Sequence, residues 1–175
     1  MNAAPIPNAA SLPSRRTLNL LGFLACAGLL AYAVYVQGVL RIDPCPLCIF
    51  QRIGIAACGL VFLLAWAHNP ASAWGARCYA TLVMLAALVT IGIAARHVWI
   101  QHLPEDAVPS CGAGLGFMLQ EFPVAEVIRK VLTGSGECHQ VNWEFLGLAM
   151  PTWVLLAAAG LGTLGAVANL VARRR

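Results

Sequence analysis

Residues 45–52 read CPLCIFQR, and this stretch decides how the rest of the chain is interpreted. Two cysteines separated by two residues can close a small, strained disulfide, so Cys45 and Cys48 are candidates for thiol–disulfide exchange. Pro44 and Pro46 discourage a helix before Cys45, whereas Pro46 is tolerated in a first helical turn. We therefore expect a helix to begin at or near Cys45, with both thiols at its mouth.

The composition of the chain excludes an ordinary soluble domain. Of its 175 residues, 60% are hydrophobic and 10% are charged, and the mean hydropathy is +0.77. A soluble domain carries about 25% charged residues. The net charge of +4 sits largely at the ends of apolar runs, as in membrane proteins, so we expect membrane lipids and not nucleic acid as a partner.

Four apolar segments approach the roughly 20 residues that a helix needs to span a bilayer. They predict an all-α membrane protein, a four-transmembrane-helix bundle over residues 17–172 with helices at about 18–36, 46–67, 74–95 and 152–171. A signal peptide is the rival interpretation of the first segment, but its apolar run is longer than a signal peptide requires. Residues 1–16 are expected to form a disordered cytoplasmic tail, and 173–175 a basic end.

Two loops are expected on the other side of the membrane, at about 37–45 and 97–150. The second holds six of the seven acidic residues. Apolar residues recur in it at helical spacing between Val124 and Leu132, which predicts a short amphipathic helix. Such a helix can lie on the membrane surface or pack on the bundle, and the pattern does not choose between them.

Basic residues favour an orientation with both termini in the cytoplasm. That side would then hold Arg15, Arg16, Arg77, Arg173, Arg174 and Arg175, against Arg41, Arg96, Arg129 and Lys130 on the other. The cysteines at 45, 48, 111 and 138 would all face the non-cytoplasmic, oxidising side. Cys26, Cys58 and Cys78 would be small packing residues of the helices.

The sequence offers a reason for Cys48 to be reactive. It lies in the first turn of the expected helix, where the backbone dipole stabilises a thiolate, and Arg52 follows four residues later on the same face. An arginine beside a membrane helix is costly unless it has a partner. Arg52 could instead extend to lipid phosphate, but the neighbouring cysteine pair favours a functional role.

Cys111 and Cys138 lie in the long loop, where a disulfide would be a simple staple or a partner for exchange with the first pair. Zinc is the main chemical rival, because four cysteines with His97, His102 and His139 nearby could form a metal centre. The spacing is poor for zinc, since zinc ribbons usually show two CxxC knuckles and this chain has one. Haem attachment is excluded because Ile49 follows Cys48 where a histidine is required.

The combined pattern resembles the disulfide bond formation protein B (DsbB) family of bacterial inner membranes, over roughly residues 17–172. The resemblance rests on CPLCIFQR (45–52) at the head of the second helix, the acidic loop with its cysteine pair and GSGEC (134–138), and WEFLGLAMP (143–151). This chain has Gln51 where many members have glutamate.

The resemblance implies a membrane thiol:quinone oxidoreductase that reoxidises a periplasmic DsbA-type thiol oxidase and passes electrons to ubiquinone or menaquinone. It implies two redox disulfides, Cys45–Cys48 and Cys111–Cys138, with Cys111 attacked by the partner and Cys48 adjacent to the quinone. Arg52 and His97 match residues of the quinone site, His102 less well. The termini would be cytoplasmic and the redox cysteines periplasmic.

Three other classes remain open at this point. A membrane zinc-binding or thiol-sensing protein without turnover would use the same cysteines as ligands. A structural four-helix protein would use them as loop staples. A vitamin K epoxide reductase-type protein also has four helices and uses a quinone, but its CxxC lies late in the order of helices and not at the second helix.

Overall fold

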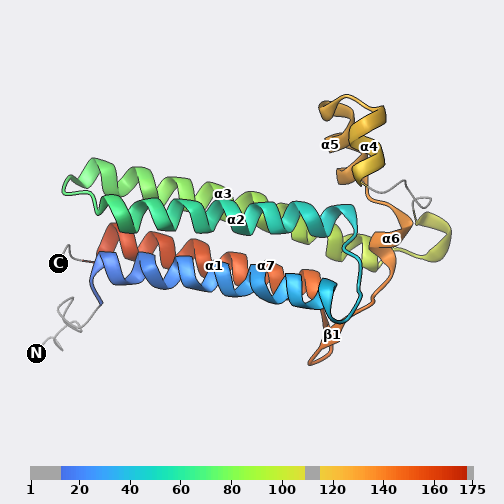
Figure 1. Ribbon diagram of the computed structural model, residues 1–175, viewed down its shortest axis with the longest axis horizontal. Helices are drawn as coiled ribbons and strands as arrows, with labels where there is room; N and C mark the ends of the chain where they lie inside the picture. The colour runs from blue at the N-terminus through green and yellow to red at the C-terminus, as the bar shows by residue number, and fades with distance from the viewer. Residues whose placement is uncertain (1–12, 109–114, 173–175) are drawn as a thin grey trace, which may run out of the picture.

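Four long helices lie side by side and form most of the molecule (Figure 1). In this computed structural model residues 13–108 and 115–172 are described. The helices are α1 (Arg15–Gly38), α2 (Pro46–His68), α3 (Ala73–Gln101) and α7 (Met150–Ala166), the last continued by a π-helical turn, η2 (Val167–Val171). Within the described ranges these are the helices long and apolar enough to cross a membrane, four in all. The predicted all-α four-helix bundle is confirmed.

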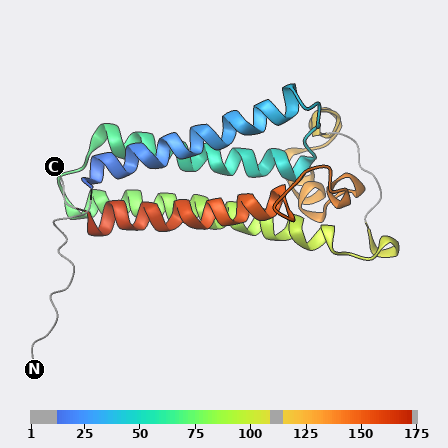
Figure 2. The ribbon, with the colours of Figure 1, turned by 90° about the horizontal axis from the view of Figure 1, so that it is seen from below.

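The bundle closes in the order α1, α2, α3, α7 around a shared core, while α1 and α7 touch each other little (Figure 2). Small residues allow the close approaches. A Cβ on Gly22 of α1 would lie 2.7 Å from the ring of Phe62 on α2, and Phe62 is fully buried. A Cβ on Gly165 of α7 would lie 2.5 Å from Val83 on α3. These glycines fix how closely the neighbouring helices pack.

Side chains cap the first turns of three of these helices. Ser14 accepts a hydrogen bond from the N–H of Thr17 at the start of α1, and Ser72 accepts one from Gly75 at the start of α3. At the start of α2 the cap is the sulfur of Cys45. Since an N-cap satisfies amides that otherwise lack a partner, the chemistry of this sulfur is coupled to the start of the helix.

Two boundaries differ from the sequence prediction. Helix α3 continues to Gln101 and not to about residue 95, so His97 lies inside the helix and not in the loop that was expected from residue 97. The polar pair Arg96 and His97 was taken as the end of the helix. Both side chains instead bind groups that pack on α3, and no proline or glycine lies between His97 and Pro104. Helix α1 begins at Arg15, inside the predicted 1–16 tail, of which residues 1–12 lie outside the described residues.

Polar groups lock the end of the bundle that holds the start of α1. Asn19 on α1 and Asn169 in η2 are buried and exchange two amide hydrogen bonds, of 3.2 and 3.1 Å. Arg15 donates to the carbonyl of Pro70 between α2 and α3 (3.0 Å) and to that of Ala172 after η2 (3.4 Å). The first and last helices are therefore joined by directional contacts as well as by packing.

The long connection between α3 and α7 carries short elements at the opposite end of the bundle (Figure 1). They are η1 (Glu105–Ala107), α4 (Leu115–Glu121), α5 (Val124–Thr133), α6 (Gly136–His139) and the hairpin strands β1 (Glu144–Phe145) and β2 (Leu148–Ala149). The predicted amphipathic helix is α5.

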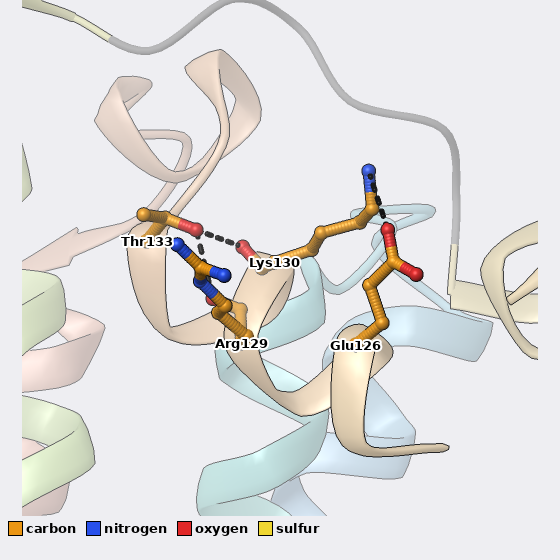
Figure 3. Close-up of polar contacts among 4 residues, drawn as sticks. All are labelled: Glu126, Arg129, Lys130 and Thr133. Carbon is orange, nitrogen blue, oxygen red and sulfur yellow. Dashed lines mark hydrogen bonds and ion pairs between the residues drawn. The ribbon is translucent and has the colours of Figure 1, made fainter. Parts of the chain in front are cut away.

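Helix α5 buries one face against the bundle and leaves another apolar face exposed. Val127 and Val131 pack in a cluster with Leu47 and Ile100, while Val124, Ile128 and Leu132 are exposed. Its polar face holds a 3.6 Å ion pair between Lys130 and Glu126, and the Thr133 hydroxyl donates to backbone carbonyls in the last turn (Figure 3). Arg96 of α3 donates to the carbonyls of Leu132 and Thr133, so the end of α5 is fixed on the bundle.

Candidate redox site

Cys45 and Cys48 meet at the start of α2. The Cys45 sulfur accepts a hydrogen bond from the backbone N–H of Cys48 at 3.4 Å, and the two Sγ atoms lie 3.2 Å apart. Cys45 is buried and Cys48 is half-buried. Within the described part of the chain the cysteines are free thiols, so the structure presents this pair as a dithiol. The predicted start of the helix agrees with the structure.

His97 lies between the cysteines and a short polar network. Its Nε2 donates to the backbone carbonyl of Cys138 at 3.1 Å, and its Nδ1 accepts from the side-chain amide of Gln51 at 3.1 Å. These two bonds specify a neutral imidazole with its proton on Nε2. The Cys45 sulfur is 3.8 Å from Nε2 and the Cys48 sulfur 4.0 Å from Nδ1. His97 and Gln51 are both buried, so this network is shielded from water.

Cys138 lies in α6 beside the same pair. Its side chain is 1% exposed and packs in one cluster with Cys45. A hydrogen bond to the Cys45 side chain, followed by burial, raises the pKa of the Cys138 thiol above its usual range. Gly134 precedes α6 with φ of +88°, and its backbone is so close to Ile100 of α3 that no side chain fits there. The loop is thereby held against α3, with Cys138 facing Cys45 as a protonated thiol.

Arg52 contacts α1, which was not predicted from the sequence. Its guanidinium donates to the Gln37 side-chain oxygen at 2.6 Å and to the Ala33 carbonyl at 3.2 Å. These bonds tie α2 to the last turns of α1. Arg52 is half-buried, and it lines the same two cavities as Cys48. Its guanidinium is therefore bonded within the bundle, on the side of α2 that carries Cys48.

Two cavities meet at Cys48 and Arg52. The first, of about 480 Å³, is the more polar of the two and is lined by apolar and polar residues together, among them Cys45, His97 and Glu137. The second, of about 440 Å³, is mostly apolar and lies between α1, α2 and α7; its wall includes Tyr32, Ile55 and Trp153. Cys48, Arg52, Trp143 and Met150 belong to both walls. Cys48 thus lies in the wall of the more polar cavity and of the apolar one.

Other predicted residues lie apart from this centre or outside the described residues. Cys111 falls among residues 109–114, outside the described ranges, so its pairing with Cys138 stays a prediction. His102 and His139 bind backbone carbonyls of α3 through Nδ1. Cys26 and Cys58 pack in the bundle core.

Three contributors were missed from the sequence as parts of the site. Gln51 had been noted only as a departure from a pattern; its place one turn before Ile55 on the buried face of α2 could have suggested a buried partner. Gln37 and Trp143 approach from other elements, and their contacts depend on how α1 and the hairpin pack. No local signal in the sequence identifies those two.

Comparison with known proteins shows the family. The model of the family described as disulfide bond formation protein DsbB matches residues 15–168. A protein named disulfide bond formation protein B from Xanthomonas euvesicatoria pv. vesicatoria (strain 85-10) is 52% identical over 161 residues, covering 92% of this chain and 94% of the relative. One so named from Methylococcus capsulatus is 52% identical over 152 residues, with coverages of 87% and 92%, and one from Nitrosococcus oceani is 51% identical over 151 residues, with coverages of 86% and 89%. With this similarity extending through all four apolar helices, the chain belongs to the disulfide bond formation protein B family.

Proposed function

We propose that this multi-pass membrane protein is a thiol:quinone oxidoreductase that reoxidises a periplasmic DsbA-type thiol oxidase and passes the electrons to a membrane quinone. Family membership already makes it a disulfide-forming oxidoreductase. The observation that carries the finer assignment is the position of Cys48 and Arg52 in the walls of both cavities. Thiol exchange needs a polar chamber reached by protein thiols, whereas a lipid-soluble acceptor needs an apolar one.

The proposed topology follows from charge. Both termini would be cytoplasmic, as the distribution of arginines predicts, and α4, α5, α6 and the hairpin would lie on the periplasmic side. Both ends of the described chain, at the start of α1 and the end of η2, lie at one end of the bundle, and Cys45, Cys48 and Cys138 lie at the other (Figure 1). That separation supports a periplasmic redox centre in an oxidising compartment.

The proposed reaction is a relay through two disulfides. A thiolate of the reduced partner attacks Cys111 of the Cys111–Cys138 disulfide, and Cys138 leaves. The second partner thiol then displaces Cys111, so the partner becomes oxidised. Cys138 attacks Cys45 of the Cys45–Cys48 disulfide, and Cys48 is released as a thiolate. Transient Cys45–Cys138 bonding is supported by the contact between these two side chains in the reduced form.

The remaining steps conserve electrons and protons. Cys111 attacks Cys138, which re-forms the loop disulfide and leaves Cys45 and Cys48 reduced. The quinone is the substrate that accepts two electrons and two protons and leaves as quinol. Cys45 and Cys48 return to a disulfide as they lose those electrons. Since a DsbA-type partner is itself a strong oxidant, at about −120 mV, the quinone must supply the driving force.

Residues around Cys48 have distinct proposed tasks. Arg52 stabilises negative charge on the Cys48 sulfur and on a reduced acceptor in the apolar cavity. His97 is held by Gln51 and the Cys138 carbonyl, so it keeps the α6 backbone beside Cys45 while sulfur exchange proceeds. The apolar wall of the second cavity suits a quinone ring, with Trp143 and Trp153 among the aromatic residues available to contact it.

The experiment is quinone reduction by the purified protein with a reduced DsbA-type oxidase. We expect one quinone reduced for each partner dithiol oxidised, measured by quinone absorbance and by thiol titration. Cys48→Ser should abolish the reaction, and Cys78→Ser, at the far end of α3, should leave it intact. Sustained quinone reduction by Cys48→Ser would refute the assignment. Oxidation of the partner without quinone consumption would point to a thiol exchanger of another kind.

A further inference from the structure

Three ligand-type side chains of the site converge in a way that thiol exchange does not require. Sulfur atoms of Cys45 and Cys48 and a ring nitrogen of His97 lie within 4.8 Å of one another. Thiolates and a neutral imidazole are the ligands that Zn²⁺ takes in proteins. From this convergence we propose that the reduced protein binds one Zn²⁺ ion through Cys45, Cys48 and His97, with the fourth position open to water.

The spacing of the ligand atoms fits a tetrahedral ion. With Zn–S of about 2.3 Å and Zn–N of about 2.0 Å, tetrahedral angles place two sulfurs about 3.8 Å apart and a sulfur and nitrogen about 3.6 Å apart. The two sulfurs are 3.2 Å apart, and the Cys48 sulfur is 4.0 Å from Nδ1 of His97. The Cys45 sulfur is 3.8 Å from the other ring nitrogen, Nε2, and the three ligand atoms lie within 4.8 Å of one another. Binding therefore requires the Cys45 sulfur and the His97 ring to turn so that both sulfurs face one ring nitrogen.

The surroundings orient the histidine as a ligand. Metal-bound histidines usually donate their second N–H to a carbonyl or carboxylate. Nε2 of His97 already donates to the Cys138 carbonyl, which leaves the Nδ1 lone pair as the ligand atom. Gln51 must turn its amide away from Nδ1 to allow this. Cys138 supplies its backbone to this arrangement, and its sulfur does not belong to the ligand group.

Charge and access also suit a divalent cation. Two thiolates and a neutral imidazole balance the charge of Zn²⁺, so the complex is neutral at the mouth of an apolar bundle. The polar cavity connects the ligands to exposed residues, of which Asp43 and Glu137 are acidic and Arg41 is basic. Arg52 lies in the same wall, so the two acidic and two basic residues balance in charge and do not attract cations to the cavity. The preference of thiolate ligands for soft metal ions would therefore select the ion.

Binding would depend on the oxidation state of the pair. Zn²⁺ displaces the two thiol protons, and a Cys45–Cys48 disulfide offers no thiolate to bind it. The ion would therefore hold the pair reduced and oppose disulfide formation. The inference needs only the reduced thiols, so it stands or fails independently of the quinone reaction.

The test is anaerobic titration of the full-length protein, reduced with a phosphine, using Co²⁺ as the spectroscopic probe. We expect one equivalent to produce thiolate-to-cobalt absorption and tetrahedral d–d bands, and Zn²⁺ to displace it. Cys45→Ser, Cys48→Ser and His97→Gln should each weaken binding by about tenfold or more, because each removes one of three protein ligands. Cys138→Ser and Cys78→Ser are the matched controls and should change it by less than about threefold.

Helical circular dichroism of each variant identifies a misfolded protein, and the wild type oxidised with diamide provides a measurement that needs no substitution. The oxidised protein should lose the cobalt bands and regain them on reduction. Absence of the bands in the reduced wild type would overturn the inference, as would undiminished binding by Cys48→Ser. An equal loss in Cys138→Ser would overturn the assignment of three ligands.

Discussion

Arg52→Met tests the proposed contact between Arg52 and the acceptor apart from the tie that Arg52 makes to α1. The guanidinium has five N–H donors, of which the Gln37 and Ala33 contacts use two, so donors remain for groups in the cavities. Methionine keeps much of the aliphatic bulk and removes the charge. We therefore expect the variant to fold, to form its disulfides and to use quinone poorly.

The expected size follows from a single charged hydrogen bond to the acceptor. Such a bond contributes about 1.5–3 kcal/mol, and about 1.4 kcal/mol corresponds to a factor of ten in an equilibrium constant. Arg52 is half-buried and partly screened by solvent, which favours the lower limit. The quinone KM of Arg52→Met should rise by about tenfold, while the KM for the reduced partner should stay within about twofold.

Gln37→Met is the matched control, because it removes the 2.6 Å tie to α1 and leaves the charge of Arg52 in place. Steady-state kinetics with varied quinone at saturating partner should give less than about a threefold change in KM for this variant. An unchanged quinone KM in Arg52→Met would refute the proposed contact with the acceptor. Equal increases in both variants would assign the effect to the tie between α1 and α2.

Three further predictions concern the loop and the bundle. The rate at which iodoacetamide alkylates reduced Cys138 should rise only above about pH 8.5, the pKa of an ordinary thiol, because the raised pKa keeps Cys138 protonated. The free energy of unfolding of the reduced protein should fall above about pH 8.5, since the thiol then ionises in the unfolded state and not in the folded state. An alkylation midpoint at or below about pH 8.5 would contradict the raised pKa. Asn19→Leu should lower the free energy of unfolding, measured by denaturant titration, by about 1–2 kcal/mol, because it removes the partner of the Asn169 amide. Changing both asparagines to leucine should recover part of that loss. Gly22→Leu should destabilise the bundle by about 1–3 kcal/mol in thermal unfolding, because Phe62 cannot move away, while Gly28→Leu, with open space around it, should change stability little.

Much of the fold could be predicted because helices that span a membrane are recognisable in a sequence by their length and apolar composition. Four apolar runs predicted four helices, and Pro46 placed the start of α2 correctly. The predicted end of α3 was wrong because Arg96 and His97, seen in the sequence alone, are typical of residues at a membrane interface. One binds the end of α5 and the other binds α6, and both contacts depend on how the long connection folds back.

The site was predictable in its sulfur atoms and not in its supporting groups. A CxxC spacing identifies Cys45 and Cys48 by itself, since two residues three positions apart at the start of a helix lie on the same face, where their thiols can meet. The network of Gln51, His97 and the Cys138 carbonyl joins three elements that are remote in the chain, so no periodicity or spacing indicates it.

The proposed relay gives Cys45 and Cys48 different roles, and the reason for the difference lies at the start of α2. Cys45 caps α2 with its sulfur and is buried against α6, so its exchange partner must come from the loop, where Cys138 already contacts it. Cys48 stands one turn further along the chain, where the walls of the polar and the apolar cavity coincide. A sulfur at that junction can give electrons to an acceptor from the membrane without leaving its place beside Cys45. In the proposed relay, the order from loop to Cys45 to Cys48 to acceptor is therefore the one expected when the first sulfur caps the helix and the second lines the apolar cavity.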